Sequence, residues 1–537
     1  MTGLVIENLS VDIHHTSILR NVSLSVAPGE ILAITGESGS GKSMTALAAL
    51  HLLPPLARAS GTIRLGDQTL SELPETALCT IRGRGLGMVF QEPMTALNPL
   101  QTIGAQVAET IRIHTRKTAA QAEAQAIETL KRVGLPPDRF PPGRYPHQLS
   151  GGQRQRVVIA MAIALNPQVL IADEPTTALD VTTQAQILDL LVSLTRKEGM
   201  GLMLVTHDLA VVASYAHRIA VMQKGEVVET GRTDLVLSDM KHPYTRMLFA
   251  AASHRVNLPP APASSTLMTV RDLERHYPLA RRHLFRKRTV FEAVRGVSFT
   301  IDRGERVGLV GESGCGKSTL IRAVLGLEPV QAGSVTLSGQ EITGDPRAAR
   351  IARQKMQVVF QDPYGSFNPR HTVARLITEP YHLLDKPPSG QARKDAVAEA
   401  LSAVGLRAQD SNRYIHEFSG GQRQRIAIAR ALIIQPELII FDEAVSALDV
   451  SVRAQILDLL AVLCRTHALT YLFVSHDLTV VRSVTDRVLV MQAGRIVEEG
   501  RTEQVFGHPQ HEYTRSLLAA APRLPEHLIR NQDLHRR

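Results

Sequence analysis

The sequence predicts an α/β protein in which one domain plan occurs twice. The first indication is a pair of glycine-rich segments, GESGSGKS at residues 36–43 and GESGCGKS at residues 311–318, each directly after a short apolar run. Both match the pattern of a loop between a strand and a helix that surrounds phosphate groups. The second indication is that further motifs recur in the same order in both halves, which indicates duplication of a whole domain.

The repeat divides the chain into two long domains. Corresponding residues are Ser43 and Ser318, Gln91 and Gln361, and Ser150 and Ser419. We predict a first domain at residues 1–252, a linker at 253–266, a second domain at 267–521 and a basic tail at 522–537. The linker is rich in proline and has no periodicity, which indicates a short and fairly stiff tether.

The composition excludes several classes of protein. The chain has 537 residues, of which 44% are hydrophobic and 21% charged, as is ordinary for a globular protein. We expect no signal peptide, because the N-terminus has no succession of basic, apolar and small residues. We expect no membrane span, because the longest apolar stretch, residues 157–172, is interrupted by Asn166 and Pro167. The three cysteines are scattered, so no disulfide framework or metal cluster is predicted and a reducing cytoplasm is expected. The formal charge of +9 suits an anionic neighbour, although a solvated basic surface is the commoner explanation.

Each half opens with a predicted hairpin that leads to its phosphate loop. Residues 4–13 alternate between apolar and polar, which predicts a strand, and the apolar residues 31–35 predict the strand that enters the first loop. Residues 267–310 repeat this order before the second loop. A helix is expected to begin at Lys42 and at Lys317, directly after each loop.

A helical insertion is predicted in the middle of each half, at residues 103–132 and 373–404, where alanine and charged residues have helical spacing. Each insertion is followed by SerGlyGlyGlnArgGlnArg, which begins at Ser150 and at Ser419 and opens a strongly helical stretch. Serine is a favourable N-cap, so a helix should start directly after it.

The last part of each half places acidic residues and a histidine at strand ends. Apolar strands end in AspGlu at residues 173–174 and 442–443, and AlaLeuAsp follows within a few residues. Later strands run into ThrHisAsp at 206–208 and SerHisAsp at 475–477. Acids at the carboxyl ends of strands are typical of the binding edge of an α/β sheet. The halves close with HisProTyrThrArg and HisGluTyrThrArg.

The order of phosphate loop, glutamine, SerGlyGlyGln, AspGlu, AlaLeuAsp and histidine, found twice, resembles the nucleotide-binding domains of ABC ATPases. The resemblance covers nearly the whole chain. It implies two tandem P-loop ABC ATPase domains, each with a RecA-like core, an antiparallel β subdomain and a helical subdomain. It also implies ATP and Mg²⁺ as cofactors.

The phosphate loops would supply the nucleotide site. Their glycines let backbone N–H groups turn toward phosphate oxygens at a helix N-terminus, and each loop lysine would contact the β- and γ-phosphates. The expected loop residues are Gly36, Ser38, Gly39, Ser40, Gly41, Lys42 and Ser43, and then Gly311, Ser313, Gly314, Cys315, Gly316, Lys317, Ser318 and Thr319. At Cys315 the helix N-terminus should favour the thiolate, whereas burial would oppose it.

The resemblance also assigns the metal-binding and catalytic groups. The expected Mg²⁺ site residues are Ser43, Gln91 and Asp173 in the first half and Ser318, Gln361 and Asp442 in the second. Gln91 and Gln361 would sense both the metal and the attacking water. Glu174 and Glu443 would orient and polarise that water. His207 and His476 match the family's switch histidine, which contacts the γ-phosphate.

By the same resemblance, each site would be completed by the other half. The SerGlyGlyGln residues are Ser150, Gly151, Gly152 and Gln153, and Ser419, Gly420, Gly421 and Gln422. The site of Lys42 would then use Ser419 and Gly421, and that of Lys317 would use Ser150 and Gly152. Both catalytic carboxylates are present, so we expect two active sites. Because the second half has Ala444 where the first has Pro175, their rates can differ.

The family usually stacks adenine on an aromatic residue upstream of the phosphate loop. Aligning Leu9 with Leu273 places Ile13 opposite Tyr277, so the second site would hold the base on a tyrosine face and bind ATP more tightly. The alternative for Tyr277 is packing within its hairpin. The basic run at residues 281–288 is most simply a solvated hairpin tip, with contact to headgroups or a permease as the alternative.

The segments QEPMTALNP from Gln91 and QDPYGSFNPR from Gln361 look like the oligopeptide, dipeptide and nickel importer branch. The fusion resembles single-chain versions that serve peptide, glutathione or microcin-type importers. This implies an ATPase subunit at the cytoplasmic face of the bacterial inner membrane, beneath two permease chains fed by an extracytoplasmic solute-binding protein.

Two other classes of ABC protein are alternatives to an importer ATPase. Tandem ABC proteins that act on ribosomes usually have a long, charged helical linker, unlike the short proline-rich one here. DNA-repair ABC ATPases carry coiled coils or zinc modules, and neither heptads nor metal-ligand spacing occurs. We therefore expect no nucleic-acid partner.

Overall fold

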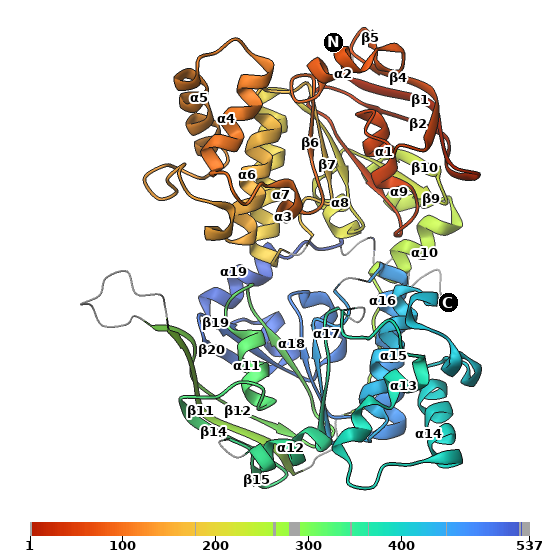
Figure 1. Cartoon of the computed structure of the whole chain (residues 1–537), viewed down its shortest axis with the longest axis vertical. Coiled ribbons are helices and arrows are strands. Elements are labelled where there is room, and N and C mark those ends of the chain that lie inside the picture. The colour runs from red at the N-terminus through yellow and green to blue at the C-terminus, as the bar shows by residue number, and fades with distance from the viewer. Residues whose placement is uncertain are drawn as a thin grey trace. The chain divides into compact units, whose positions relative to one another are not determined.

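A computed structural model describes residues 3–177, 179–260, 265–278, 290–343, 346–362, 365–446, 448–525 and 528. Contacts within the chain define two compact units (Figure 1). Unit 1 comprises Met1–Ser253, Asp449–Ser451 and Pro522–Arg537, and unit 2 comprises His254–Leu448 and Val452–Ala521. In the described part of the chain, no helix is long and apolar enough to cross a bilayer.

Unit 1 is built on two sheets with helices packed around them. Its strands are β1 Leu4–Ile13, β2 Thr16–Val26, β3 Ile31–Thr35, β4 Ala57–Leu65, β5 Gln68–Thr69, β6 Leu86–Val89, β7 Val169–Asp173, β8 Gly201–Val205, β9 Arg218–Gln223 and β10 Glu226–Arg232. Its α-helices are α1 Lys42–Ala49, α2 Glu75–Ile81, α3 Pro93–Ala96, α4 Ile103–His114, α5 Ala119–Arg132, α6 Gly151–Ile163, α7 Val181–Glu198, α8 Leu209–Tyr215, α9 Thr233–Asp239 and α10 Pro243–Ala252. One sheet has the order β2-β1-β4-β5, and the other has the order β10-β9-β3-β8-β7-β6.

Unit 2 repeats this architecture. Its strands are β11 Thr266–Pro278, β12 Val290–Asp302, β13 Arg306–Val310, β14 Ala332–Leu337, β15 Gln340–Glu341, β16 Met356–Val359, β17 Leu438–Asp442, β18 Tyr471–Val474, β19 Arg487–Gln492 and β20 Arg495–Arg501. Its α-helices are α11 Lys317–Val324, α12 Pro346–Lys355, α13 Val373–Ile377, α14 Gly390–Ala403, α15 Gly420–Leu432, α16 Val450–His467, α17 Leu478–Val484, α18 Thr502–Gly507 and α19 Glu512–Ala520. The sheets have the orders β12-β11-β14-β15 and β16-β17-β18-β13-β19-β20.

The central strand of each six-stranded sheet enters the phosphate loop. In unit 1, β3 lies between β8 and β9 and is parallel to both, and in unit 2, β13 lies between β18 and β19 in the same way. Every residue of β3 and β13 is buried, as expected for strands covered on both faces. The loops therefore lie at the carboxyl ends of the central strands, the edge where α/β sheets bind ligands.

The structure confirms the predicted α/β fold class, and α1 and α11 begin at the predicted lysines. The first predicted insertion is a pair of helices, α4 and α5. The second is less helical than predicted, because α13 ends at Ile377, a 3₁₀ segment covers Glu379–Leu383, and α14 begins only at Gly390. Prolines at 380, 387 and 388 account for this, since proline has no N–H to continue a helix.

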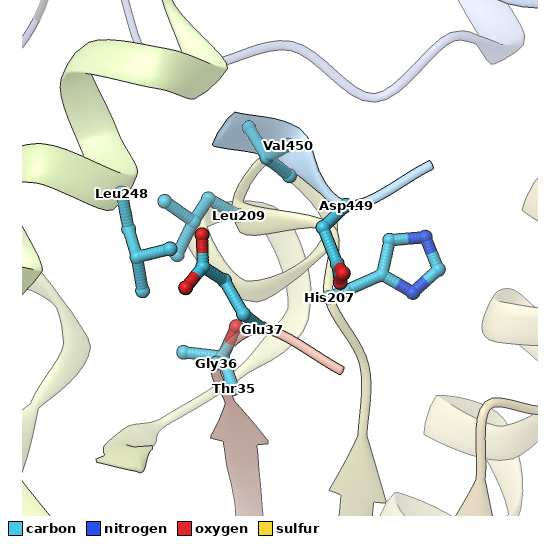
Figure 2. Close-up of a pocket in the computed structure, with 8 residues that line it drawn as sticks. All are labelled: Thr35, Gly36, Glu37, His207, Leu209, Leu248, Asp449 and Val450. Atoms are coloured by element: carbon cyan, nitrogen blue, oxygen red, sulfur yellow. The ribbon is translucent and has the colours of Figure 1, made fainter. Parts of the chain in front are cut away.

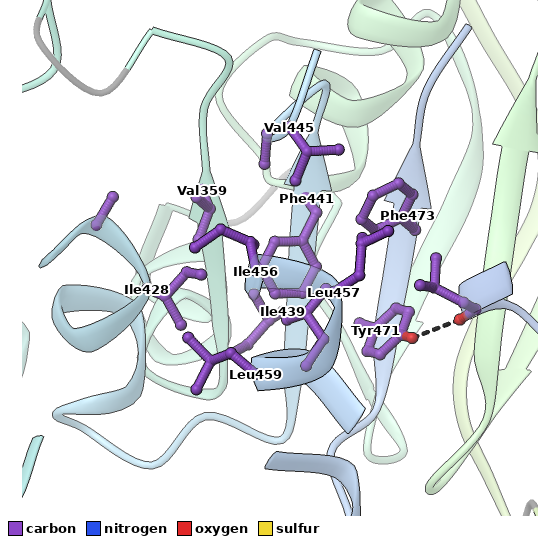
Figure 3. Close-up of a cluster of buried hydrophobic side chains, with 14 of the residues drawn as sticks. Val359, Ile428, Ile439, Phe441, Val445, Ile456, Leu457, Leu459, Tyr471 and Phe473 are labelled. Carbon is purple, nitrogen blue, oxygen red and sulfur yellow. Dashed lines mark hydrogen bonds between the residues drawn. The ribbon is translucent and has the colours of Figure 1, made fainter. Parts of the chain in front are cut away.

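Aromatic side chains pack between neighbouring strands in the core of unit 2 (Figure 3). The rings of Phe441 on β17 and Tyr471 on β18 meet edge to face with their centroids 5.6 Å apart, and Phe473 lies against both. The buried Tyr471 hydroxyl donates a hydrogen bond to the carbonyl oxygen of Val484, shown dashed. This pairing satisfies a polar group that burial would otherwise penalise.

The start of the predicted linker packs on unit 2. The guanidinium of Arg306, only 2% exposed, donates to both carboxylate oxygens of Asp486, at 2.7 and 2.6 Å, and to the carbonyl oxygen of Pro259 at 2.6 Å. His254 lies 2.8 Å from a carboxylate oxygen of Asp458. The planar fork of arginine suits the bidentate pairing with Asp486, and the same guanidinium holds Pro259 against unit 2.

Candidate functional site

The phosphate loops of both units have the same backbone design. The residue before the loop lysine, Gly41 or Gly316, has a left-handed φ of 102° or 112° and forms the N-cap of the helix. At Gly36 an added Cβ would lie 2.2 Å from the carbonyl oxygen of Met222, so no side chain fits there. The glycines therefore keep the loop in a conformation that directs backbone N–H groups inward, which fits a phosphate.

The loop lysines are buried and held by the loop itself. Lys42 Nζ donates to the carbonyl oxygens of Gly36 and Glu37 at 2.8 and 2.9 Å. In unit 2, Lys317 Nζ donates to the carbonyl oxygens of Gly311 and Glu312 at 2.7 and 2.8 Å. An ammonium group has three donors, so a third proton can serve a phosphate oxygen. Burial lowers the pKa of Lys42, and the surrounding carboxylates partly oppose this.

The residues predicted to hold Mg²⁺ lie at the first turn of each loop helix, at the end of β7 or β17, and just after β6 or β16. Ser43 Oγ donates to Asp173 Oδ1 at 3.1 Å in unit 1. In unit 2, Ser318, Gln361 and Asp442 line one cavity of about 780 Å³. A carboxylate, a hydroxyl and an amide oxygen are donors that suit Mg²⁺, which also takes water and substrate phosphates. Burial raises the pKa of both Asp173 and Asp442.

Glu174 is held by three side chains of unit 1. Gln91 Nε2 donates to its Oε2 at 2.9 Å, Thr177 Oγ1 donates to the same oxygen at 3.0 Å, and His207 Nδ1 lies 3.2 Å from Oε1. Burial acts to raise the pKa of Glu174, but the hydrogen bonds from His207 and Thr177 and the charge of Lys42 outweigh it and lower that pKa to about 2. The carboxylate therefore stays ionised, as an acceptor for a proton must be.

Glu443 has fewer side-chain partners in unit 2. His476 Nδ1 lies 3.4 Å from Glu443 Oε2, and this hydrogen bond lowers the pKa of Glu443. Burial acts to lower the pKa of His476, but the Glu443 carboxylate outweighs it and raises that pKa. Within the described residues, no hydrogen bond joins Gln361 to Glu443, whereas the equivalent Gln91 and Glu174 are bonded.

Both glutamates have an unusual backbone conformation. The φ of Glu174 is 45° and that of Glu443 is 51°, in the left-handed region that non-glycine residues rarely adopt. The N–H of Glu174 donates to the carbonyl oxygen of Val205 at 3.0 Å, and that of Glu443 donates to Val474 at 2.9 Å. Strain of this kind persists where surrounding structure fixes it, and it is concentrated at functional sites.

The SerGlyGlyGln segments form the N-termini of α6 and α15. Ser150 Oγ accepts from Gln153 N at 3.4 Å while Gln153 Oε1 accepts from Ser150 N at 3.0 Å, and Ser419 and Gln422 form the same reciprocal pair. This confirms the predicted serine N-cap. An added Cβ at Gly152 would lie 2.2 Å from the Thr183 side chain, so the second glycine is a packing requirement.

Figure 2 shows the start of the first phosphate loop beside the predicted switch histidine. Thr35, Gly36 and Glu37 line a small pocket with His207 and with Leu209 of α8. Leu248 of α10 lines the same pocket. The sheet edge thus brings together residues that are far apart in sequence, including one from the C-terminal part of the unit.

Tyr277 lies near the end of β11, opposite Phe291 of β12. The Arg275 guanidinium lies 4.4 Å from the Tyr277 ring centroid, and the Tyr277 hydroxyl donates to Glu328. In unit 1, Ile13 pairs with Thr16 and Ala57. Asn8 and Asp272 share a positive φ, 53° and 44°, five residues before Ile13 and Tyr277, which agrees with the predicted alignment. The basic run at 281–288 lies outside the described residues.

One site feature was left open by the sequence and another was missed. Burial raises the pKa of Cys315, so the thiol form prevails over the thiolate that the helix N-terminus would favour. Thr177, three residues after Glu174, was missed as a partner of the carboxylate. Its hydroxyl at this spacing is the only sequence signal for that contact.

Comparison with known proteins identifies the family to which these motifs belong. The ABC transporter family matches residues 19–177 and 294–446. The chain belongs to the ABC transporter family. Its two cassettes are ABC-type ATPase domains that bind ATP. A second family, the oligopeptide/dipeptide transporter C-terminal region, matches residues 228–257 and 497–535.

Two relatives match the chain over nearly its whole length. The chain is 46% identical over 529 residues to the peptidoglycan transport ATP-binding protein YejF of Agrobacterium fabrum, covering 96% of each chain. It is 44% identical over 578 residues to the glutathione import ATP-binding protein GsiA of Escherichia coli strain K12, covering 99% of this chain and 92% of that protein. These matches confirm the family that the paired motifs indicated.

Proposed function

We propose that this ABC ATPase powers the import of peptides or peptide-like solutes. Two observations support the proposal: the C-terminal region of oligopeptide and dipeptide transporters matches the end of both halves, at residues 228–257 and 497–535, and the relatives are named for glutathione import and peptidoglycan transport. The chain would work with two permease subunits and an extracytoplasmic solute-binding protein at the cytoplasmic face of the bacterial inner membrane. The cassettes are proposed at residues 1–252 and 267–521, with a linker at 253–266 and a tail at 522–537.

The observation that carries the hydrolytic assignment is the Glu174 carboxylate, ionised and oriented by Gln91 and His207. We assign it the role of accepting a proton from the attacking water. Lys42 would neutralise charge on the phosphates, and His207 would contact the γ-phosphate. Mg²⁺, held by Ser43, Gln91 and Asp173, would neutralise charge that develops on the phosphate oxygens.

Unit 2 would use the corresponding groups. Glu443 is the proposed base, His476 its partner, and Lys317 the phosphate ligand; Ser318, Gln361 and Asp442 would hold the metal. Tyr277, a partly buried aromatic residue near the end of β11 with Arg275 over its ring, is the proposed adenine platform. The participation of Ser150 and Ser419 in nucleotide binding stays a prediction from the family resemblance.

The proposal is tested by the double variant Glu174→Gln and Glu443→Gln. Glutamine keeps the shape of the side chain but cannot take up a proton, so Mg²⁺-dependent ATP turnover should fall by about 100-fold or more. ATP binding, measured separately, should persist. Undiminished turnover would overturn the assignment, and stable co-purification with ribosomes rather than permeases would overturn the importer role.

A further inference from the structure

Each phosphate loop donates a backbone hydrogen bond to the hydroxyl of a tyrosine in the C-terminal region of its own unit. The hydroxyl oxygen of Tyr244, on α10, accepts from the backbone N–H of Glu37 at 3.0 Å. The hydroxyl oxygen of Tyr513, on α19, accepts from the N–H of Glu312 at 2.9 Å. These contacts join residues about 200 positions apart, 207 and 201, and they occur in both units. The tyrosines belong to HisProTyrThrArg and HisGluTyrThrArg, the closing motifs that no step of the proposed hydrolysis uses.

The tyrosines are held rigidly by the start of their helices. His242 Nδ1 accepts from Tyr244 N at 3.2 Å, and the Glu229 carboxylate on β10 accepts from the N–H groups of Lys241 and His242 at 2.8 and 3.1 Å. Tyr244 itself is 5% exposed. The ring therefore has a fixed position relative to the loop, as a group that orients another must have.

Unit 2 uses the same set of contacts around Tyr513. His511 Nδ1 accepts from Tyr513 N at 3.2 Å, and the Glu498 carboxylate accepts from the N–H groups of Gln510 and His511 at 2.8 and 3.1 Å. Tyr513 is 7% exposed. The residue between histidine and tyrosine differs, Pro243 in one unit and Glu512 in the other, without changing the arrangement.

The residue that the tyrosine contacts also holds the loop lysine. The carbonyl oxygen of Glu37 accepts from Lys42 Nζ, while its N–H is bonded to Tyr244. The same residue is thus fixed on both sides, and its orientation sets where the lysine ammonium lies. Burial raises the pKa of Tyr244 to about 12, so the phenol is neutral at physiological pH and its oxygen keeps a lone pair for this N–H.

We propose that Tyr244 and Tyr513 are positioning residues for ATP binding, which act by fixing the first turn of the phosphate loop and through it Lys42 and Lys317. This inference rests on the proposed nucleotide sites at these lysines. It gives the C-terminal region a role inside the cassette, where it tunes nucleotide affinity. The Tyr244 hydroxyl also donates to a carboxylate oxygen of Glu37 at 3.5 Å, so removal of the hydroxyl releases both the N–H and the side chain of Glu37. Its loss should weaken nucleotide binding by about three- to tenfold.

The test uses the full chain with one site silenced. In a Lys317→Ala background, Tyr244→Phe removes only the hydroxyl, and the dissociation constant of a fluorescent ATP analogue is measured at the remaining site. The matched control is Tyr215→Phe, which removes a hydroxyl bonded to Asp189 at 3.3 Å in the same unit, away from the loop. We expect about three- to tenfold weaker binding for Tyr244→Phe and unchanged binding for Tyr215→Phe.

The kinetics separate positioning from general stability. In the otherwise unaltered chain, Tyr244→Phe should raise KM for ATP and leave kcat nearly unchanged, measured well below the melting temperature of each variant. Equal KM values for the Tyr244→Phe and Tyr215→Phe variants would overturn the inference. If Lys42→Ala in the Lys317→Ala background leaves binding intact, it is the proposed nucleotide site that fails.

Discussion

The two cassettes share every motif but not every contact. Glu174 in unit 1 has Gln91, Thr177 and His207 as side-chain partners, whereas in the described part of unit 2 only the His476 side chain lies within bonding distance of the Glu443 carboxylate. The hydroxyl of Ser446, at the position of Thr177, donates instead to the carbonyl oxygen of Glu443 at 2.9 Å. The same motifs can therefore be preorganised to different degrees, and preorganisation is what lowers a barrier.

The largest effect should separate the two glutamates. If unit 1 holds the better organised site, Glu174→Gln should lower ATP turnover by about tenfold or more, and Glu443→Gln by less than about threefold. Steady-state phosphate release from both single variants measures this. Equal losses would show that the additional contacts around Glu174 do not affect the rate.

The second comparison concerns the adenine side, where unit 2 has the aromatic residue. Tyr277→Ala should weaken nucleotide binding at the site of Lys317 by about tenfold, since stacking of a base on an aromatic ring is worth about 1–3 kcal/mol. Ile13→Ala should change little at the site of Lys42. Binding of a fluorescent nucleotide to chains with only one intact loop lysine measures both, and equal losses would show that the hairpin alignment does not reflect the binding mode.

A smaller difference is expected between Thr177→Val and Ser446→Ala. The first removes a hydrogen bond to the carboxylate itself, and the second removes one to a backbone oxygen. Turnover should fall about two- to fivefold for Thr177→Val, in line with one hydrogen bond, and remain within about twofold for Ser446→Ala. The phosphate-release assay used for the glutamate variants measures both. A larger loss of turnover from Ser446→Ala than from Thr177→Val would show that unit 2, not unit 1, holds the better organised site.

The smallest expected effect is a pH dependence of the stability that His476 contributes in unit 2. The pKa of His476 is raised above its ordinary value of 6.5, so the stability that its protonated ring contributes is present below that value and is lost as pH rises through the folded-state pKa. The melting temperature of the unaltered chain should exceed that of His476→Gln most at about pH 6 and least at about pH 9. A difference that grows with pH would contradict the assigned pairing with Glu443.

Much of the fold and the site could be predicted, because the chemistry depends on local patterns. Strand, loop and helix around Lys42, and the capped helix after Ser150, follow from residues adjacent in sequence. The contact of Tyr244 with Glu37 could not be predicted, since it depends on how two distant segments pack. At Cys315 the helix N-terminus acts to lower the pKa of the thiol and burial acts to raise it. Only the burial found in the structure decides between these two effects.

The docking of residues 254–259 on unit 2 bears on how the gene could be divided. A split that gave the second product its start at Leu267, where the repeat begins, would remove the Pro259 carbonyl from Arg306 and leave that guanidinium with one partner fewer. A split before His254 would keep these contacts. The second product of a two-gene version of this subunit would therefore need to begin with residues 254–266, which precede the second repeat in this chain.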